Sequence, residues 1–173
     1  MLDEAVGVLA RTLGPDLASR LAQAPVLLMA FSGGDKALAA GLAERGGADS
    51  GFVNRIEGIV LLDAVFEAAP RIDAWLKPRS GRVFLVGLYS KLSAPWTDKL
   101  IDRWEARRLR YEQFLPDRIG RGSVVLVRVQ TEHGAIANDG PPRDPITEIL
   151  RLLPPPLRRG RDTKTAVSAG GAV

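Results

Sequence analysis

The chain has 173 residues, of which 46% are hydrophobic and 25% charged, and its formal net charge is +4. This composition is typical of a globular protein of about one domain. No apolar run reaches the roughly 18 residues that a membrane span needs. The absence of cysteine excludes disulfides and cysteine nucleophiles, and His133 is the only histidine, which excludes a two-histidine metal site. We therefore expect no metal ion and no cofactor.

Basic residues gather in the region 103–110 and again near the end of the chain, at 158–164. A basic patch can bind nucleic acid. Acidic residues alternate with the arginines of the first region, however, as on a solvated helix face, so we expect no nucleic acid partner. The first 20 residues are amphipathic with acids near the start, and no signal peptide is visible, so we expect a cytoplasmic protein.

Taken in order, the chain begins with an expected helix over 2–22, where apolar residues recur every three or four positions as in a helix packed on a sheet. Gly14-Pro15 is expected to kink or split this helix. Val26–Phe31 is an unbroken apolar run, which predicts a strand covered on both faces. A helix is expected over 36–45, with Gly46-Gly47 ending it.

After a polar loop over 48–55, further strands are expected at 56–62, 82–88 and 123–129, and further helices at 70–76, 96–114 and 145–153. Asp144 is a candidate N-cap for the last helix. Residues 154–173 hold prolines, basic residues and a run of small residues, which predicts a disordered tail after a domain over 1–153. Near-continuous apolar strands that alternate with helices predict an α/β fold, a mostly parallel sheet of about four strands flanked by helices.

Three polar residues follow strands of this expected sheet. Ser32 comes directly after the first strand, Asp63 ends the second, and His133 lies just past the fourth. Sites in open parallel sheets form at the carboxyl ends of the strands, so we expect the three side chains at one edge. Gly33 and Gly34 allow a tight turn that exposes the serine hydroxyl and leaves the Gly33 N–H free for an anion. Taken singly, each residue has a simpler interpretation: a turn serine, a capping aspartate and a loop histidine.

The segments Ala30-Phe31-Ser32-Gly33-Gly34, Leu61-Leu62-Asp63-Ala64 and Glu132-His133-Gly134 resemble the α/β-hydrolase family over residues 2–153. The first is similar to the nucleophile elbow G-x-S-x-G, with alanine for the first glycine. The resemblance implies that Ser32 is the nucleophile, His133 the general base and the Gly33 N–H an oxyanion donor. It also implies acyl transfer on a small-molecule ester without a cofactor.

The family usually carries the acid of its triad after the strand that here ends at Leu88. No carboxylate follows there until Asp98. Some members carry the acid one strand earlier, which corresponds to Asp63. We favour Asp63, with Asp98 as the alternative and with Asp73 and Glu132 as weaker ones.

The family's sheet begins with several strands before the elbow, whereas one expected helix precedes Ser32 here. The chain thus resembles a truncated α/β-hydrolase, its C-terminal portion, and the turn that supplies a second oxyanion donor has no counterpart. The first strand should then be an exposed edge, which favours a homo-oligomer.

Three functional hypotheses follow. The first is a serine hydrolase, esterase- or lipase-like and weakly active. The second is a non-catalytic α/β module that binds a partner through the basic helix and tail. The third is a nucleotide-binding domain with Ser32-Gly33-Gly34 as a phosphate turn; it lacks the G-x-x-x-x-G-K-[ST] and G-x-G-x-x-G motifs and leaves His133 unexplained.

Overall fold

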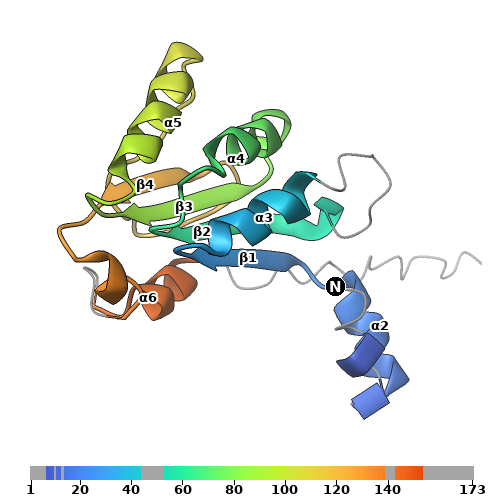
Figure 1. Cartoon of the computed structure of the whole chain (residues 1–173). Helices are drawn as coiled ribbons and strands as arrows, with labels where there is room; N and C mark the ends of the chain where they lie inside the picture. Colours follow the sequence, from blue (N-terminus) through green and yellow to red (C-terminus); the bar gives the residue numbers. More distant parts are fainter. Residues whose placement is uncertain (1–6, 10, 13, 44–52, 139–142, 154–173) are drawn as a thin grey trace, which may run out of the picture.

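A four-stranded, all-parallel sheet forms the centre of the protein (Figure 1). The computed structural model describes residues 7–9, 11–12, 14–43, 53–138 and 143–153. The strands lie side by side in chain order: β1 Val26–Phe31, β2 Ile56–Leu62, β3 Phe84–Tyr89 and β4 Val124–Arg128. The expected α/β fold is confirmed, and the bounds of β1 and β2 are those expected from the sequence.

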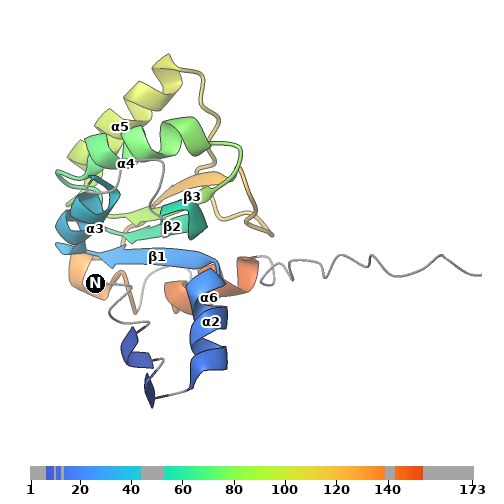
Figure 2. The ribbon, with the colours of Figure 1, turned by 90° about the vertical axis from the view of Figure 1, so that its right-hand side faces the viewer.

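Helices cover both faces of the sheet. Figure 2 shows α3 (Gly34–Ala43), α4 (Ala69–Leu76) and α5 (Ala94–Ala106) on one side and α6 (Pro145–Leu152) on the other. Short 3₁₀ turns join them, η1 Val53–Arg55, η2 Lys77–Arg79 and η3 His133–Ala135. Asp144 accepts a hydrogen bond from the Thr147 N–H at 3.2 Å, which confirms it as the cap of α6.

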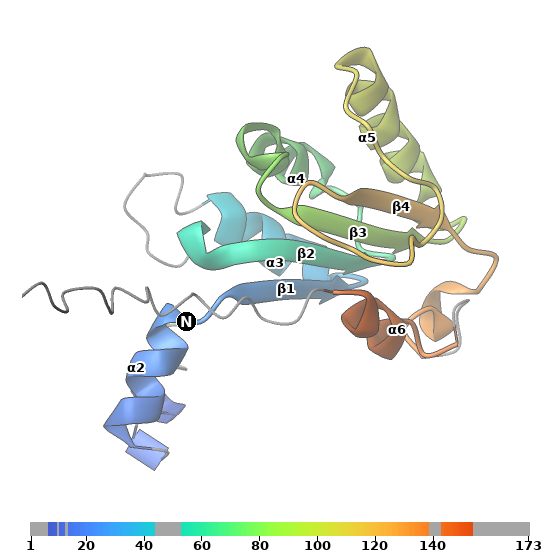
Figure 3. The ribbon, with the colours of Figure 1, turned by 180° about the vertical axis from the view of Figure 1, so that it is seen from behind.

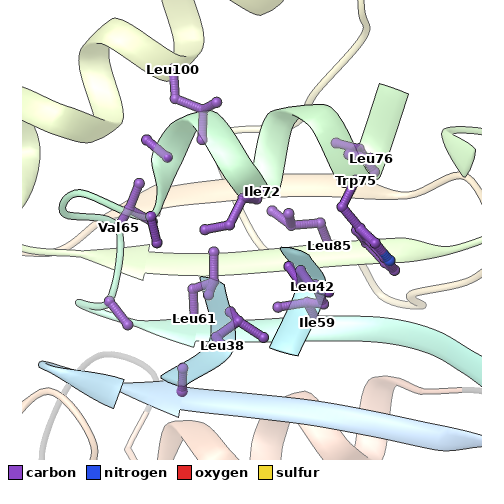
Figure 4. Packing of buried hydrophobic residues seen from close by; sticks show 14 of the residues in the cluster. Leu38, Leu42, Ile59, Leu61, Val65, Ile72, Trp75, Leu76, Leu85 and Leu100 are labelled. Atoms are coloured by element: carbon purple, nitrogen blue, oxygen red, sulfur yellow. The ribbon is translucent and has the colours of Figure 1, made fainter. Parts of the chain in front are cut away.

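Two hydrophobic clusters hold these layers together, one on each face of the sheet. In the larger cluster, alternate residues of β2 and β3 pack against α3, α4 and α5 (Figure 4), among them Leu38, Ile59, Leu61, Ile72, Leu85 and Leu100. In the smaller cluster, the other faces of β2 and β3 meet α6 and the neighbouring loops through Val60, Leu62, Val86, Leu88, Ile136 and Ile149. Burial on both faces explains why β2 and β3 read as unbroken apolar runs.

One contact within the sheet requires a glycine. Gly58 of β2 pairs with Phe84 of β3, and the phenyl ring lies over the glycine. A Cβ added at Gly58 would lie 2.2 Å from the ring, well inside van der Waals contact. The small residue inside this strand therefore makes room for a buried aromatic side chain.

Strand β1 does not have the two covered faces that its apolar sequence predicted. It is the terminal strand of the sheet, and Met29 and Phe31 are 38% and 40% exposed. Within the described part of the chain no further strand pairs with its outer edge. The expected self-association through this edge stays a prediction.

The N-terminal segment also departs from its expected packing. Gly14 has a φ of 89° and α2 begins at the next residue, spanning Pro15–Gln23, so the expected break at Gly14-Pro15 is confirmed. Val8 and Leu9 are exposed and do not pack on the sheet. Figure 3 shows α2 directed away from the strands.

Helix α5 is shorter than the helix expected over 96–114. It ends at Ala106, after which Arg108 adopts a left-handed conformation (φ 57°) and the Leu109 N–H donates to the Trp104 carbonyl at 2.9 Å. The chain then returns to the sheet, where Glu112 forms a parallel bridge with Val125 of β4. The mixed charges of this region resemble a solvated helix, but backbone pairing with β4 decides its structure.

Two sequence-based expectations lie outside the described residues, namely the disordered tail over 154–173 and the helix end at Gly46-Gly47. Within the described residues, every helix is too short or too polar to cross a bilayer.

Candidate active site

Ser32 lies in a sharp turn between β1 and α3. Its φ of 52° is unusual for a residue with a side chain. The Ser32 N–H donates to the Leu62 carbonyl at 3.2 Å, and the Ser32 carbonyl accepts from the Asp35 N–H at 3.2 Å. These bonds hold the turn at the carboxyl end of the sheet. A strained backbone conformation persists only where the surrounding structure holds it in place. Such residues cluster at functional sites.

Asp63 occupies the equivalent position at the end of β2. It also has a positive φ, 48°, and its N–H donates to the Leu88 carbonyl at 2.7 Å. Two of the four non-glycine residues with positive φ in the described structure are therefore Ser32 and Asp63. Both follow neighbouring parallel strands, which explains how residues 31 positions apart meet at one edge.

The carboxylate of Asp63 is completely buried and accepts several hydrogen bonds. The Ser90 N–H donates to Oδ1 at 2.9 Å, the Ser90 hydroxyl donates to Oδ2 at 2.5 Å, and the Ser93 hydroxyl donates to Oδ1. Burial acts to raise the pKa of Asp63, but these hydrogen bonds and the contact with His133 outweigh it and lower the pKa below its ordinary value. Asp63 is therefore a buried carboxylate that stays ionised.

His133 connects the other two residues. It begins η3, which follows β4, and its side chain is 27% exposed. Nδ1 lies 2.7 Å from Oδ2 of Asp63, and Nε2 lies 2.8 Å from Oγ of Ser32. An ionised carboxylate can only accept, so Nδ1 carries a proton, and in the neutral imidazole Nε2 then accepts from the Ser32 hydroxyl. The predicted Ser32, His133 and Asp63 thus form one continuous hydrogen-bonded series.

The alternative acids lie elsewhere. Asp98 is an exposed residue of α5. Asp73 accepts a hydrogen bond from the Trp104 indole at 2.8 Å and pairs with Arg107, and Glu132 pairs with Lys91 at 3.1 Å. Among the described residues, Asp63 is the carboxylate that contacts His133.

Two aromatic side chains contact the histidine and a third packs on one of them, and the sequence pattern did not indicate these three residues as part of the site. Phe31 stacks on the imidazole with ring centroids 5.3 Å apart, and Phe66 meets it edge-on at 6.2 Å. Trp96 contacts Phe66 at 5.4 Å. The position of Phe31 directly before Ser32 could have indicated that its ring lies at the site. Phe66 and Trp96 are brought to the site only by the tertiary fold. The rings restrict the orientation of His133 and provide an apolar surface beside Ser32.

The Gly33 N–H is the candidate anion donor. Gly33 is exposed, with open space where a side chain would be, and its N–H makes no hydrogen bond within the described part of the chain. The neighbouring Asp35 is buried in the first turn of α3, and its carboxylate accepts no hydrogen bond from the residues that the structure describes. The turn thus presents a free N–H at the positive end of the α3 dipole.

Comparison with known proteins adds nothing to this geometry. No family model, curated protein or solved structure matches the chain.

Proposed function

We propose that this protein is a serine hydrolase that cleaves an ester or a related acyl bond, with Ser32 as the nucleophile. The hydrogen-bonded series from Ser32 Oγ to His133 Nε2 and from His133 Nδ1 to Asp63 carries the proposal. Both distances lie within the range needed for proton transfer between a nucleophile and a base. The positive φ of Ser32 supports the same role, since a strained turn is how a serine is exposed at a sheet edge.

The reaction that fits this arrangement has two halves. His133 Nε2 removes the proton from Ser32 Oγ as the oxygen attacks the acyl carbonyl, and the imidazolium returns that proton to the departing alcohol. Water then attacks the acyl-Ser32 ester with the same histidine as base, releasing the acid and free Ser32. Asp63 holds the Nδ1–H tautomer and stabilises the imidazolium. The Gly33 N–H faces the developing oxyanion.

A weak hydrolase is the specific expectation. Gly33 is the candidate oxyanion donor that we identify, and the loss of one donor from a complete hole lowers the rate by about 10²–10³. The order Ser32, Asp63, His133 along the chain and the elbow-like turn also favour kinship with α/β-hydrolases. A non-catalytic module is the rival hypothesis; it gives no reason for a histidine placed between a strained serine and a buried carboxylate.

Labelling with a fluorophosphonate probe tests the proposal, because the probe reacts covalently with an activated serine. We expect labelling of the full chain, its loss in Ser32→Ala and His133→Ala, and a decrease of about 10²–10⁴ in rate for Asp63→Asn. Ser80→Ala, a serine in the turn before β3, and Asp98→Asn are matched controls that should label normally. A folded protein that resists labelling would contradict the proposal and favour the non-catalytic module.

A further inference from the structure

A basic groove lies at the opposite end of the sheet from Ser32, where β1, β2 and β3 begin. Pro25, Ile56 and Val83, which precede or start these strands, line it, and its volume is about 1050 Å³. Small-molecule sites have volumes of about 300–1000 Å³, so the groove is large enough for a ligand of cofactor size. We propose that it binds a small phosphate-rich anion, such as a polyphosphate or a nucleoside triphosphate.

The groove is strongly basic. Five arginines line the groove: Arg20, Arg55, Arg79, Arg82 and Arg121. Glu57 is the one acidic residue among the described lining residues, which leaves a net charge of five minus one, or +4. Clefts lined by one sign of charge attract ions of the other sign.

Two of these arginines, Arg55 and Arg79, are held in place by groups that do not neutralise them. Arg55 donates from Nη1 to the carbonyls of Leu21 at 2.8 Å and Ala24 at 3.2 Å. Arg79 donates to the Trp75 carbonyl at 3.1 Å, and its guanidinium lies 5.6 Å from the centroid of the Trp75 ring. Carbonyls and aromatic rings orient a guanidinium but leave its full charge and its other N–H donors. Such preorganisation lowers the entropic cost of binding.

The remaining arginines complete the anion site. Arg82 donates to the Pro78 carbonyl at 3.2 Å, and Arg121 pairs with Glu57 at 3.1 Å. Arg20 is exposed and has no partner among the residues that the structure describes. Guanidinium groups are permanently charged and match the geometry of phosphate oxygens. The arginines line one groove and do not form a continuous basic surface that could follow a nucleic acid backbone. This arrangement favours a small phosphate-rich ligand over a nucleic acid.

Calorimetric titration of the full chain with sodium tripolyphosphate and with ATP, at about 150 mM salt, tests the inference independently of the proposed hydrolase activity. We expect saturable binding of both at one site. Arg20→Gln combined with Arg82→Gln should weaken it at least about tenfold. The matched control, Arg103→Gln combined with Arg128→Gln, removes the same charge from α5 and from the end of β4 and should change affinity less than about twofold. Glu57→Gln should strengthen binding, because it removes the acidic residue of the groove.

Several results would overturn the inference. These are the absence of saturable binding by a protein with a native circular dichroism spectrum, an equal effect of the two double substitutions, and unchanged or weaker binding in Glu57→Gln. Binding of ATP without tripolyphosphate would show that phosphate is not the recognised group. A single-stranded oligonucleotide serves as the last comparison. If it binds more tightly than ATP and tripolyphosphate, and if Arg20→Gln combined with Arg82→Gln abolishes that binding, the ligand of the groove is a nucleic acid and not a small anion.

Discussion

Removal of the Ser93 hydroxyl tests whether hydrogen bonds keep Asp63 ionised. Asp63 accepts from the Ser90 N–H, the Ser90 hydroxyl, the Ser93 hydroxyl and His133, all in a buried setting. Ser93→Ala deletes one of these four bonds and leaves Oδ1 with the Ser90 N–H. Hydrogen bonds to charged groups contribute about 1.5–3 kcal/mol, so we expect the free energy of unfolding to fall by that amount at pH 7.

The pH dependence distinguishes this effect from simple loss of packing. The pKa of Asp63 is lowered in the folded protein, so its ionised form stabilises the fold above the unfolded-state pKa, and this stabilisation is lost as pH falls through the folded-state pKa. The difference in free energy of unfolding between Ser93→Ala and the parent protein should therefore become smaller in acid. In an acid titration, the variant should unfold at a higher pH than the parent.

Thr97→Val is the matched control for this experiment. The buried Thr97 hydroxyl donates to the neutral Ser93 carbonyl at 3.1 Å. Loss of this hydroxyl should lower the free energy of unfolding by about 0.5–1.5 kcal/mol, independently of pH. Urea denaturation at pH 7 and at lower pH measures both variants. If Ser93→Ala lowers the free energy of unfolding by less than about 0.5 kcal/mol at pH 7, or by the same amount in acid, the Ser93 hydroxyl does not keep Asp63 ionised.

Other positions yield predictions about stability. Gly58→Ala should destabilise the fold by about 1–3 kcal/mol in urea denaturation, because the new Cβ meets the buried ring of Phe84; an unchanged midpoint would contradict that contact. Ser32→Gly should abolish probe labelling yet be about 1 kcal/mol more stable than Ser32→Ala, since glycine adopts positive φ without strain; equal thermal stability would argue against a strained turn. Arg108→Gly should leave the free energy of unfolding unchanged or raise it, because Arg108 has a positive φ, whereas Arg103→Gly within α5 should lower it by about 1 kcal/mol. A lower denaturation midpoint for Arg108→Gly than for Arg103→Gly would contradict the end of α5 at Ala106.

Much of the site could be predicted because its residues follow strands directly or within a few positions. A parallel sheet brings the carboxyl ends of its strands to one edge, so Ser32, Asp63 and His133 could be grouped from their positions alone. The choice between Asp63 and Asp98 could not be decided in the same way. The acid is the carboxylate that contacts Nδ1 of His133, and that carboxylate belongs to Asp63. The contact depends on how the segments that connect the strands pack in three dimensions.

Local sequence was enough to predict the strands, the turn after Val26–Phe31 and the break at Gly14-Pro15. Unbroken apolar runs favour buried strands, glycine tolerates tight turns, and proline does not continue a helix. Other features depend on contacts between distant parts of the chain. Ser90 and Ser93 bind Asp63 from a segment 27 to 30 residues away, and arginines from four separate segments line one groove. These features depend on which segments become neighbours, and that is settled by the packing of the whole chain.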